Sequence, residues 1–197
     1  MKKLFTLAFS ALMVLGVASC GSKAPADPDH TYHAVGGWGD WNATDDNKME
    51  AITKSDAEAL GVKLDGKSVE YIYKYDLTIG SANVDWEASA KVNGEVKKFN
   101  GKFTIKAIAA SWDKEEETYN HDQWIPNPAD TGPAHVEALT DNLFFPAYQK
   151  EKDPDGFSWA DNPVITSGEG DYTFVCVKYT TVSTATDIGY GFALLKK

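Results

Sequence analysis

The strongest constraint on the fold is an alternation of apolar and polar residues between Val69 and Ile79. In "VEYIYKYDLTI" every odd-numbered position is Val, Tyr, Leu or Ile, whereas the even-numbered positions include Glu, Lys, Asp and Thr. A period of two places successive side chains on opposite faces, which is typical of a strand with one face buried. This run therefore predicts a sheet packed on one side against a core.

Two Asn-Gly dipeptides extend the strand pattern. Asn93-Gly94 and Asn100-Gly101 favour tight hairpin turns, because both residues tolerate a positive φ. Around them we expect three strands, near 84–92, 95–99 and 102–109, the last with Phe103, Ile105 and Ala107 on one face.

The C-terminal residues repeat the pattern. "GDYTFVCVKY", a polar Thr/Ser stretch and "GYGFALLKK" predict the closing hairpin of an antiparallel sheet. The predicted fold class is all-β, a single antiparallel β-sandwich (immunoglobulin-like or carbohydrate-binding-module-like) with long loops, over residues 32–197.

One short helix and one long irregular region interrupt the strands. Ser55 and Glu58 have the spacing of a capping box, and Gly61 follows as a helix-ending residue. Between Trp112 and Ser167 the sequence is rich in proline and shows little regular pattern. Long loops within a compact domain tend to be functional.

The N-terminal residues predict export and a lipid anchor. Lys2 and Lys3 precede an apolar run too short to span a bilayer comfortably as a helix. The following "VASC" resembles the bacterial lipobox, which implies a signal peptide over 1–19 and lipidation of Cys20. Residues 20–31 are expected to form a flexible tether. Gly21 in place of Asp implies, by the same resemblance, passage to the outer membrane.

The charge of the chain limits its partners. A formal net charge of −10 disfavours nucleic acid and anionic headgroups, so membrane contact is expected only through the anchor. With Cys20 lipidated, Cys176 has no partner for a disulfide within the domain. It lies in a strand-like run and is expected to be a buried small apolar residue.

Enzyme and metal signatures are weak. The sequence has no nucleophile elbow, zinc-protease motif or phosphate loop, so we expect no catalysis and no cofactor. A hydrolase with an unrecognised carboxylate pair remains an alternative. Of the histidines, His30 and His33 are expected to be a solvated pair beside the tether. "DPDGFSWAD" resembles part of a calcium loop, with Asp153, Asp155 and Asp161 as the candidate ligands, and a turn without a metal is the alternative.

Aromatic residues in polar surroundings are the most informative functional feature. An aromatic ring covers the apolar C–H face of a sugar, while nearby Asp, Asn, Gln or Lys side chains bind its hydroxyl groups. All tryptophans except Trp86 are expected at strand ends or in loops, and one of the pair Trp38 and Trp41 is expected to anchor its loop in the core. The candidate glycan-binding residues are Trp112, Tyr119, Trp124, Trp159, Trp38 and Trp41.

Several short motifs resemble one family. "YHAVGGWGDWN" with the later Met49 resembles the start of a binding module of the SusE/SusF class of outer-membrane starch-binding lipoproteins, through Tyr32, Val35, Gly36 and Trp38. "GKFTIKAIAASWD", "GEGDYTFVCVKY" and "YGFALLKK" are similar to later strands of such modules. The chain departs from the family in having one module and long insertions around 60–70 and 114–160.

The resemblance implies a lipid-anchored protein of the outer membrane, displayed on the cell surface. It implies non-catalytic binding of a polysaccharide or oligosaccharide, with other polysaccharide-uptake proteins of that membrane as partners. An alternative that the residues leave open is a structural or protein-binding accessory lipoprotein without a sugar site.

Overall fold

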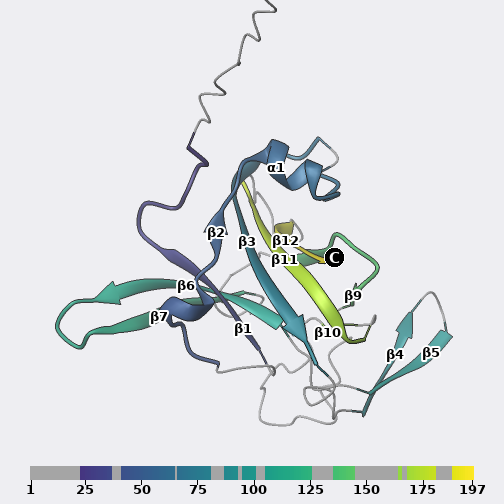
Figure 1. The fold of residues 1–197 in the computed structure, drawn as a ribbon. Helices are drawn as coiled ribbons and strands as arrows, with labels where there is room; N and C mark the ends of the chain where they lie inside the picture. The colour runs from purple at the N-terminus through teal and green to yellow at the C-terminus, as the bar shows by residue number, and fades with distance from the viewer. Residues whose placement is uncertain are drawn as a thin grey trace, which may run out of the picture.

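The computed structural model shows a mostly β, sandwich-like fold (Figure 1). It describes residues 23–36, 41–64, 66–80, 87–92, 95–100, 105–125, 135–144, 164–165, 168–180 and 188–197. Among these residues the larger sheet has the strand order β2-β3-β11-β12-β8, with bounds Glu50–Ala51, Val69–Ile79, Gly170–Tyr179, Ile188–Lys196 and His135–Ala138. The smaller sheet has the order β1-β6-β7, with bounds Thr31–Gly36, Ile105–Asp113 and Thr118–Ile125. Two short pairs complete the strands, β4 (Glu87–Val92) with β5 (Glu95–Asn100), and β9 (Leu143–Phe144) with β10 (Val164–Ile165).

The main core lies between the two sheets and follows the predicted alternation. In β3, Tyr73, Leu77 and Ile79 are buried in it, and Tyr71 and Tyr75 pack against it. Other strands contribute alternate residues: Tyr32 and Ala34 from β1, Ile105, Ala107 and Ala109 from β6, Tyr172, Phe174 and Cys176 from β11, and Tyr190, Phe192 and Leu194 from β12. The predicted strand at Val69–Ile79, the shared face of Ile105 and Ala107, and the burial of Cys176 are therefore confirmed.

A second apolar layer covers the outer face of the five-stranded sheet. The short helix α1 (Lys54–Ala59) and the residues after it place Ala57, Val62 and Leu64 against side chains of β3, β11 and β12. The helix begins two residues earlier than the sequence suggested. Its N-cap is Thr53 and not Ser55, and Asp56 supplies the reciprocal bond of the capping box. Ser55 lies inside the helix, so the Ser55–Glu58 box was wrong, whereas Gly61 follows the helix with φ 96° as expected.

The hairpin predictions are confirmed for the closing strands and for the pairing of the strands that flank residues 93–94, which themselves lie outside the described residues, as does Gly101. β11 pairs antiparallel with β12, and Val92 pairs with Glu95 across the first Asn-Gly dipeptide. The third predicted strand, 102–109, is β6, which runs further, to Asp113. One strand departs from the antiparallel expectation, because β8 pairs with β12 in parallel.

The expectation of an irregular region after Trp112 was wrong for its first part. Trp112 lies within β6, and Tyr119 and Trp124 lie within β7, which pairs antiparallel with β6 over its length. These aromatic residues therefore project from a sheet instead of a loop. The β6–β7 hairpin extends beyond β1 and forms the left-hand projection in Figure 1.

Candidate binding surface on the three-stranded sheet

The outward face of the β1-β6-β7 sheet carries an aromatic cluster. Its apolar floor consists of Val35, Ile108 and Ala110, which are buried, and Ala43 lies over them from the loop that follows β1. Trp41, Tyr119 and Trp124 pack against this floor and remain partly exposed. We call this set, together with Trp112, the aromatic surface.

A β-bulge places the aromatic residues of β7 on one face. Ala110 pairs with His121, but Ala109 pairs with Gln123, so Asp122 is an extra residue in β7. The extra residue shifts the alternation by one position. Tyr119 and Trp124 therefore lie on the same face although they are five residues apart.

Trp112 is the most accessible member of the surface. Its exposed fraction is 49%, and within the described part of the chain only Leu60 is another exposed large hydrophobic residue. The Trp112 and Tyr119 rings meet edge to face, with centroids 4.9 Å apart. Edge-to-face contact restrains both rings, and about half of the Trp112 side chain stays accessible to solvent.

The Tyr119 hydroxyl is fixed by a carboxylate. It donates a hydrogen bond of 2.7 Å to Asp45 Oδ1, from the short 3-10 helix η1 (Asp45–Asn47). The hydrogen bond to Asp45, with burial adding to it, raises the pKa of Tyr119 to about 12. Tyr119 is therefore neutral near pH 7 and its ring orientation is set by the loop above it.

Trp124 occupies the other end of the surface. The His121 ring meets it edge to face at 5.2 Å, and Lys106 Nζ lies 5.8 Å from its ring centroid. His121 Nε2 accepts a hydrogen bond of 3.1 Å from the backbone N–H of Ala43. Trp124 is therefore contacted by Lys106 of β6 and by His121, whose ring is fixed in turn by the loop.

The loop over the surface is held by a buried polar pair, His33 and Asn47. His33 Nδ1 donates to Thr44 O at 2.9 Å and to Asn47 Oδ1 at 3.1 Å. Asn47 Oδ1 also accepts from the backbone N–H of Thr44, and its Nδ2 donates to Asn42 O. The His33 ring lies beneath Tyr119, with centroids 4.5 Å apart. The pair thus fixes the loop that carries Trp41 through hydrogen bonds, and the His33 ring packs against the ring of Tyr119.

The environment of His33 differs from the sequence expectation. Its exposed fraction is 0%, so the expectation of a solvated histidine beside the tether was wrong. Burial is the main cause that lowers its pKa. His33 is neutral at pH 7, and its Nε2 lies 2.8 Å from Thr31 Oγ1.

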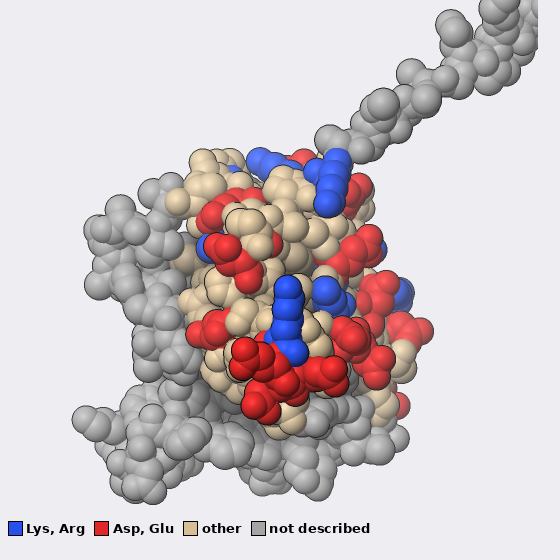
Figure 2. Space-filling view, turned by 90° about the vertical axis from the view of Figure 1, so that its left-hand side faces the viewer, with Lys and Arg blue, Asp and Glu red and all other residues tan. Residues whose placement is uncertain are grey.

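The tip of the β6–β7 hairpin is acidic and locally ordered. The Asp113 carboxylate accepts hydrogen bonds from the backbone N–H groups of Glu115 and Glu116, and these bonds lower its pKa. The side chains of Glu115, Glu116 and Glu117 are exposed. Figure 2 faces the side of the molecule toward which this hairpin points and shows Asp and Glu side chains gathered there, with Lys side chains between them.

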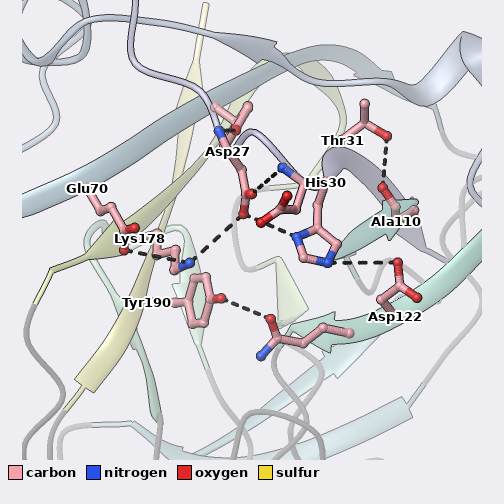
Figure 3. A network of polar contacts seen from close by, with 11 residues as sticks. Asp27, His30, Thr31, Glu70, Ala110, Asp122, Lys178 and Tyr190 are labelled. Carbon is pink, nitrogen blue, oxygen red and sulfur yellow. Dashed lines mark hydrogen bonds and ion pairs between the residues drawn. The ribbon is translucent and has the colours of Figure 1, made fainter. Parts of the chain in front are cut away.

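A second polar cluster connects the segment before β1 to both sheets (Figure 3). The Asp27 backbone N–H donates to the Tyr73 hydroxyl at 2.7 Å, and its carboxylate lies 3.4 Å from His30 Nδ1 and 4.0 Å from Lys178 Nζ. His30 Nε2 lies 3.9 Å from Asp122 Oδ2, on the bulge of β7. Tyr73 and Lys178 belong to the five-stranded sheet, so this cluster joins residues 27–30 to the two sheets.

The chemistry of this second cluster is suited to fixing residues 27–30 against the folded domain. The Asp27 side chain is only 8% exposed, and its carboxylate is surrounded by His30 and Lys178. Lys178 is shared with Glu70, 3.6 Å away, and the Tyr190 hydroxyl donates to Gln123 Oε1 at 3.1 Å. Residues 27–30, which the sequence placed in the tether, thus contact the folded domain.

Of the six predicted glycan-binding residues, the structure brings four together: Trp41, Trp112, Tyr119 and Trp124. Trp41 packs on the outer face of the small sheet and not in the core between the sheets. Trp38 and Trp159, the predicted lipidation site Cys20, and the calcium candidates Asp153, Asp155 and Asp161 lie outside the described residues.

Sequence reasoning missed the residues that support the surface. His33, Asp45, Asn47 and His121 carry no local motif that links them to Trp112 or Trp124. The alternation of Tyr119 and His121 in "TYNHDQWI" was the available sign of a strand, and the bulge at Asp122 conceals its continuation to Trp124.

The described ranges contain no group of three or more His, Cys, Asp or Glu side chains placed to hold a metal ion. Nor does any helix within them have the length and apolar character needed to cross a bilayer.

No protein-family model matches the chain, and no curated protein or solved structure matches it either. Function is therefore inferred from the residues of the aromatic surface and from the sequence motifs.

Proposed function

We propose that the protein binds a polysaccharide or oligosaccharide without catalysis, through the aromatic surface of the β1-β6-β7 sheet. The observation that carries this proposal is Trp112, half exposed and fixed edge to face against Tyr119. In this proposal the sandwich serves as a carbohydrate-binding module, as the resemblance to the SusE/SusF class implies.

The chemistry of the surface suits a sugar. A solvent-exposed indole face can cover the C–H face of a pyranose ring, whose hydroxyl groups need polar partners at its edge. Lys106 and Asp45 lie at the two ends of the surface. These groups offer donors and acceptors beside the aromatic rings.

Rigidity supports the proposal further. Tyr119 is held by Asp45, Trp124 by His121 and Lys106, and the loop by His33 and Asn47. A surface that is ordered before binding loses less conformational entropy when the ligand arrives. The cost of exposing Trp112 to water is then offset only when a ligand covers it.

The first experiment is a binding screen with a matched control. The full chain, purified in detergent, is tested by affinity gel electrophoresis against a panel of soluble polysaccharides, and any ligand is then titrated by calorimetry. By analogy with bases that stack on aromatic side chains, Trp112→Ala should cost about 1–3 kcal/mol, or about tenfold or more in affinity. Leu60→Ala, which removes the other exposed large hydrophobic side chain, should bind like the parent.

Two outcomes would contradict the proposal. If Trp112→Ala binds as the parent does, with an unchanged melting temperature, the aromatic surface is not the site. If no polysaccharide binds the parent, a protein-binding accessory role becomes the better proposal, and Trp112 is then the first residue to test in that role.

The cellular setting is part of the same proposal. We infer a lipid anchor at Cys20 and display at the outer membrane from the lipobox-like "VASC" and Gly21. Cys20→Ala should release the protein from the membrane fraction or leave it unprocessed. Membrane fractionation of the variant to the parent's extent would refute the anchor.

A further inference from the structure

The aromatic surface is flanked at one end by fixed negative charge. Trp112 pairs with Tyr119, and the next pair along the hairpin is Asp113 with Thr118. The turn between these residues carries Glu115, Glu116 and Glu117, with Lys114 as its only basic side chain. Four carboxylates and one ammonium group therefore lie within five residues of the accessible indole.

The separation is short enough for these charges to act on a ligand. Glu117 is the residue before β7 and lies two residues from Tyr119, and two residues of chain span at most about 7 Å. The Debye length at physiological ionic strength is about 8 Å, so a ligand on Trp112 lies within the range of the tip carboxylates.

The tip is built to keep its carboxylates outside. Asp113 accepts two backbone hydrogen bonds from the turn and lies 3.5 Å from Asn120 Nδ2, and the side chains of Glu115, Glu116 and Glu117 are exposed. On the loop side of Tyr119 the charges are again negative, from Asp45 and the neighbouring Asp46.

The opposite end of the surface differs in charge. Lys106 lies over Trp124, which pairs with Ile108, four positions from Trp112 along β6. The surface is therefore negative where its aromatic ring is most accessible and positive where the ring is half buried. An anionic group on the sugar that covers Trp112 would meet the negative end.

We propose that the hairpin tip, through Glu115, Glu116 and Glu117, makes this site selective for uncharged glycans against those that carry carboxylate or sulfate groups. This inference rests on the proposed function. It assigns to the three glutamates a specificity-determining role at a site whose affinity comes from the aromatic rings.

The size of the effect follows from the charges. One repulsion between unit charges about 8 Å apart in water corresponds to roughly a twofold change in affinity, and three amount to about tenfold at low salt. Screening reduces the difference as the salt concentration rises, because these side chains are exposed.

The test compares matched polymers. Starch, cellulose and dextran derivatives are used in soluble neutral and carboxymethylated forms, with the full chain, at about 20 mM and 500 mM salt, where the Debye length falls from roughly 20 Å to roughly 4 Å. We expect the neutral form of whichever backbone binds to bind about tenfold more tightly than its carboxymethylated form at low salt, and nearly equally at high salt.

Two variants separate a local from a global charge effect. Glu115→Gln/Glu116→Gln/Glu117→Gln should remove most of the discrimination and leave binding of the neutral polymer unchanged. The control Glu50→Gln/Glu58→Gln/Glu169→Gln removes the same charge at exposed positions on other elements and should keep the discrimination.

The outcomes distinguish the two proposals. If binding depends on Trp112 but neutral and carboxymethylated forms bind equally at low salt, or if the tip variant keeps the difference, the selectivity inference is overturned and the glycan site stands. If no polymer binds in a Trp112-dependent manner, both are overturned.

Discussion

Replacing Gly191 by Ala tests whether the outer layer of the five-stranded sheet is packed as described. Gly191 lies in the middle of β12, paired with Val177 of β11 and Glu137 of β8. Replacement of a strand glycine by Ala usually stabilises a protein by about 0.4–1 kcal/mol, because the unfolded chain loses freedom. Here we expect the opposite sign.

The reason is a lack of space at the position of a Cβ atom. A Cβ at residue 191 would lie 2.6 Å from the Tyr179 hydroxyl oxygen and 2.9 Å from Leu139 Cδ1, where ordinary contact begins at 3.4 Å. Tyr179 cannot move freely, since its hydroxyl donates to Glu137 at 2.7 Å and Lys67 Nζ lies 5.0 Å from its ring centroid.

The magnitude follows from these contacts. Overpacking of this kind costs about 1–3 kcal/mol, which outweighs the entropic gain, so Gly191→Ala should destabilise by about 1–2 kcal/mol. For a domain of this size each kcal/mol lowers the melting temperature by about 2–4 °C. Denaturant titration and thermal melts provide both values.

Two further variants make the test decisive. Gly80→Ala is the matched control, because nothing lies within 4 Å of its Cβ position, and it should be neutral or slightly stabilising. Tyr179→Phe removes the clashing oxygen, so Gly191→Ala should cost less in that background than in the parent. A Gly191→Ala protein as stable as Gly80→Ala, or a cost unchanged by Tyr179→Phe, would refute the packing argument.

Three other changes have expected outcomes. Burial lowers the pKa of His33. The contribution of His33 to the free energy of unfolding is therefore complete above the unfolded pKa of about 6.5 and is lost as the pH drops through the folded pKa. His33→Gln should flatten the loss of stability that denaturant titrations measure between pH 8 and 5, and an unchanged slope would contradict this. Asn47→Ala removes bonds to His33, Thr44 and Asn42 and should destabilise by about 1–3 kcal/mol, which thermal melts can check. Glu117 has φ 50°, so Glu117→Asn should raise the melting temperature slightly, and a fall would show that its side chain is needed for the turn.

Local sequence patterns were sufficient to predict those strands that have one apolar face packed against the core. The alternation in Val69–Ile79 identified β3 with its bounds, and the C-terminal runs identified the β11–β12 hairpin. In both cases the neighbouring strand is close in sequence or the apolar face is unambiguous. The parallel pairing of β8 with β12 joins distant residues and leaves no local pattern.

Other features depend on contacts that no short stretch contains. His33 alternates outward from Tyr32 and Ala34, as an exposed strand residue would, and is buried only because the loop with Asn47 closes over it. The helix start was misplaced because Thr53–Asp56 and Ser55–Glu58 both have the spacing of a capping box, and only the backbone conformation of Thr53 decides between them.

The bulge in β7 has a consequence for changes in chain length. Because Gln123 already pairs with Ala109 and His121 with Ala110, deletion of Asp122 would leave every other side chain of β7 on its present face. The ion-pair contact to His30 would be lost, but neither the core nor the aromatic rings would be exchanged. A deletion inside the regular strand β3 would instead turn half of its side chains to the wrong side. Deletion of one residue is therefore tolerated better at the bulge of β7 than inside β3.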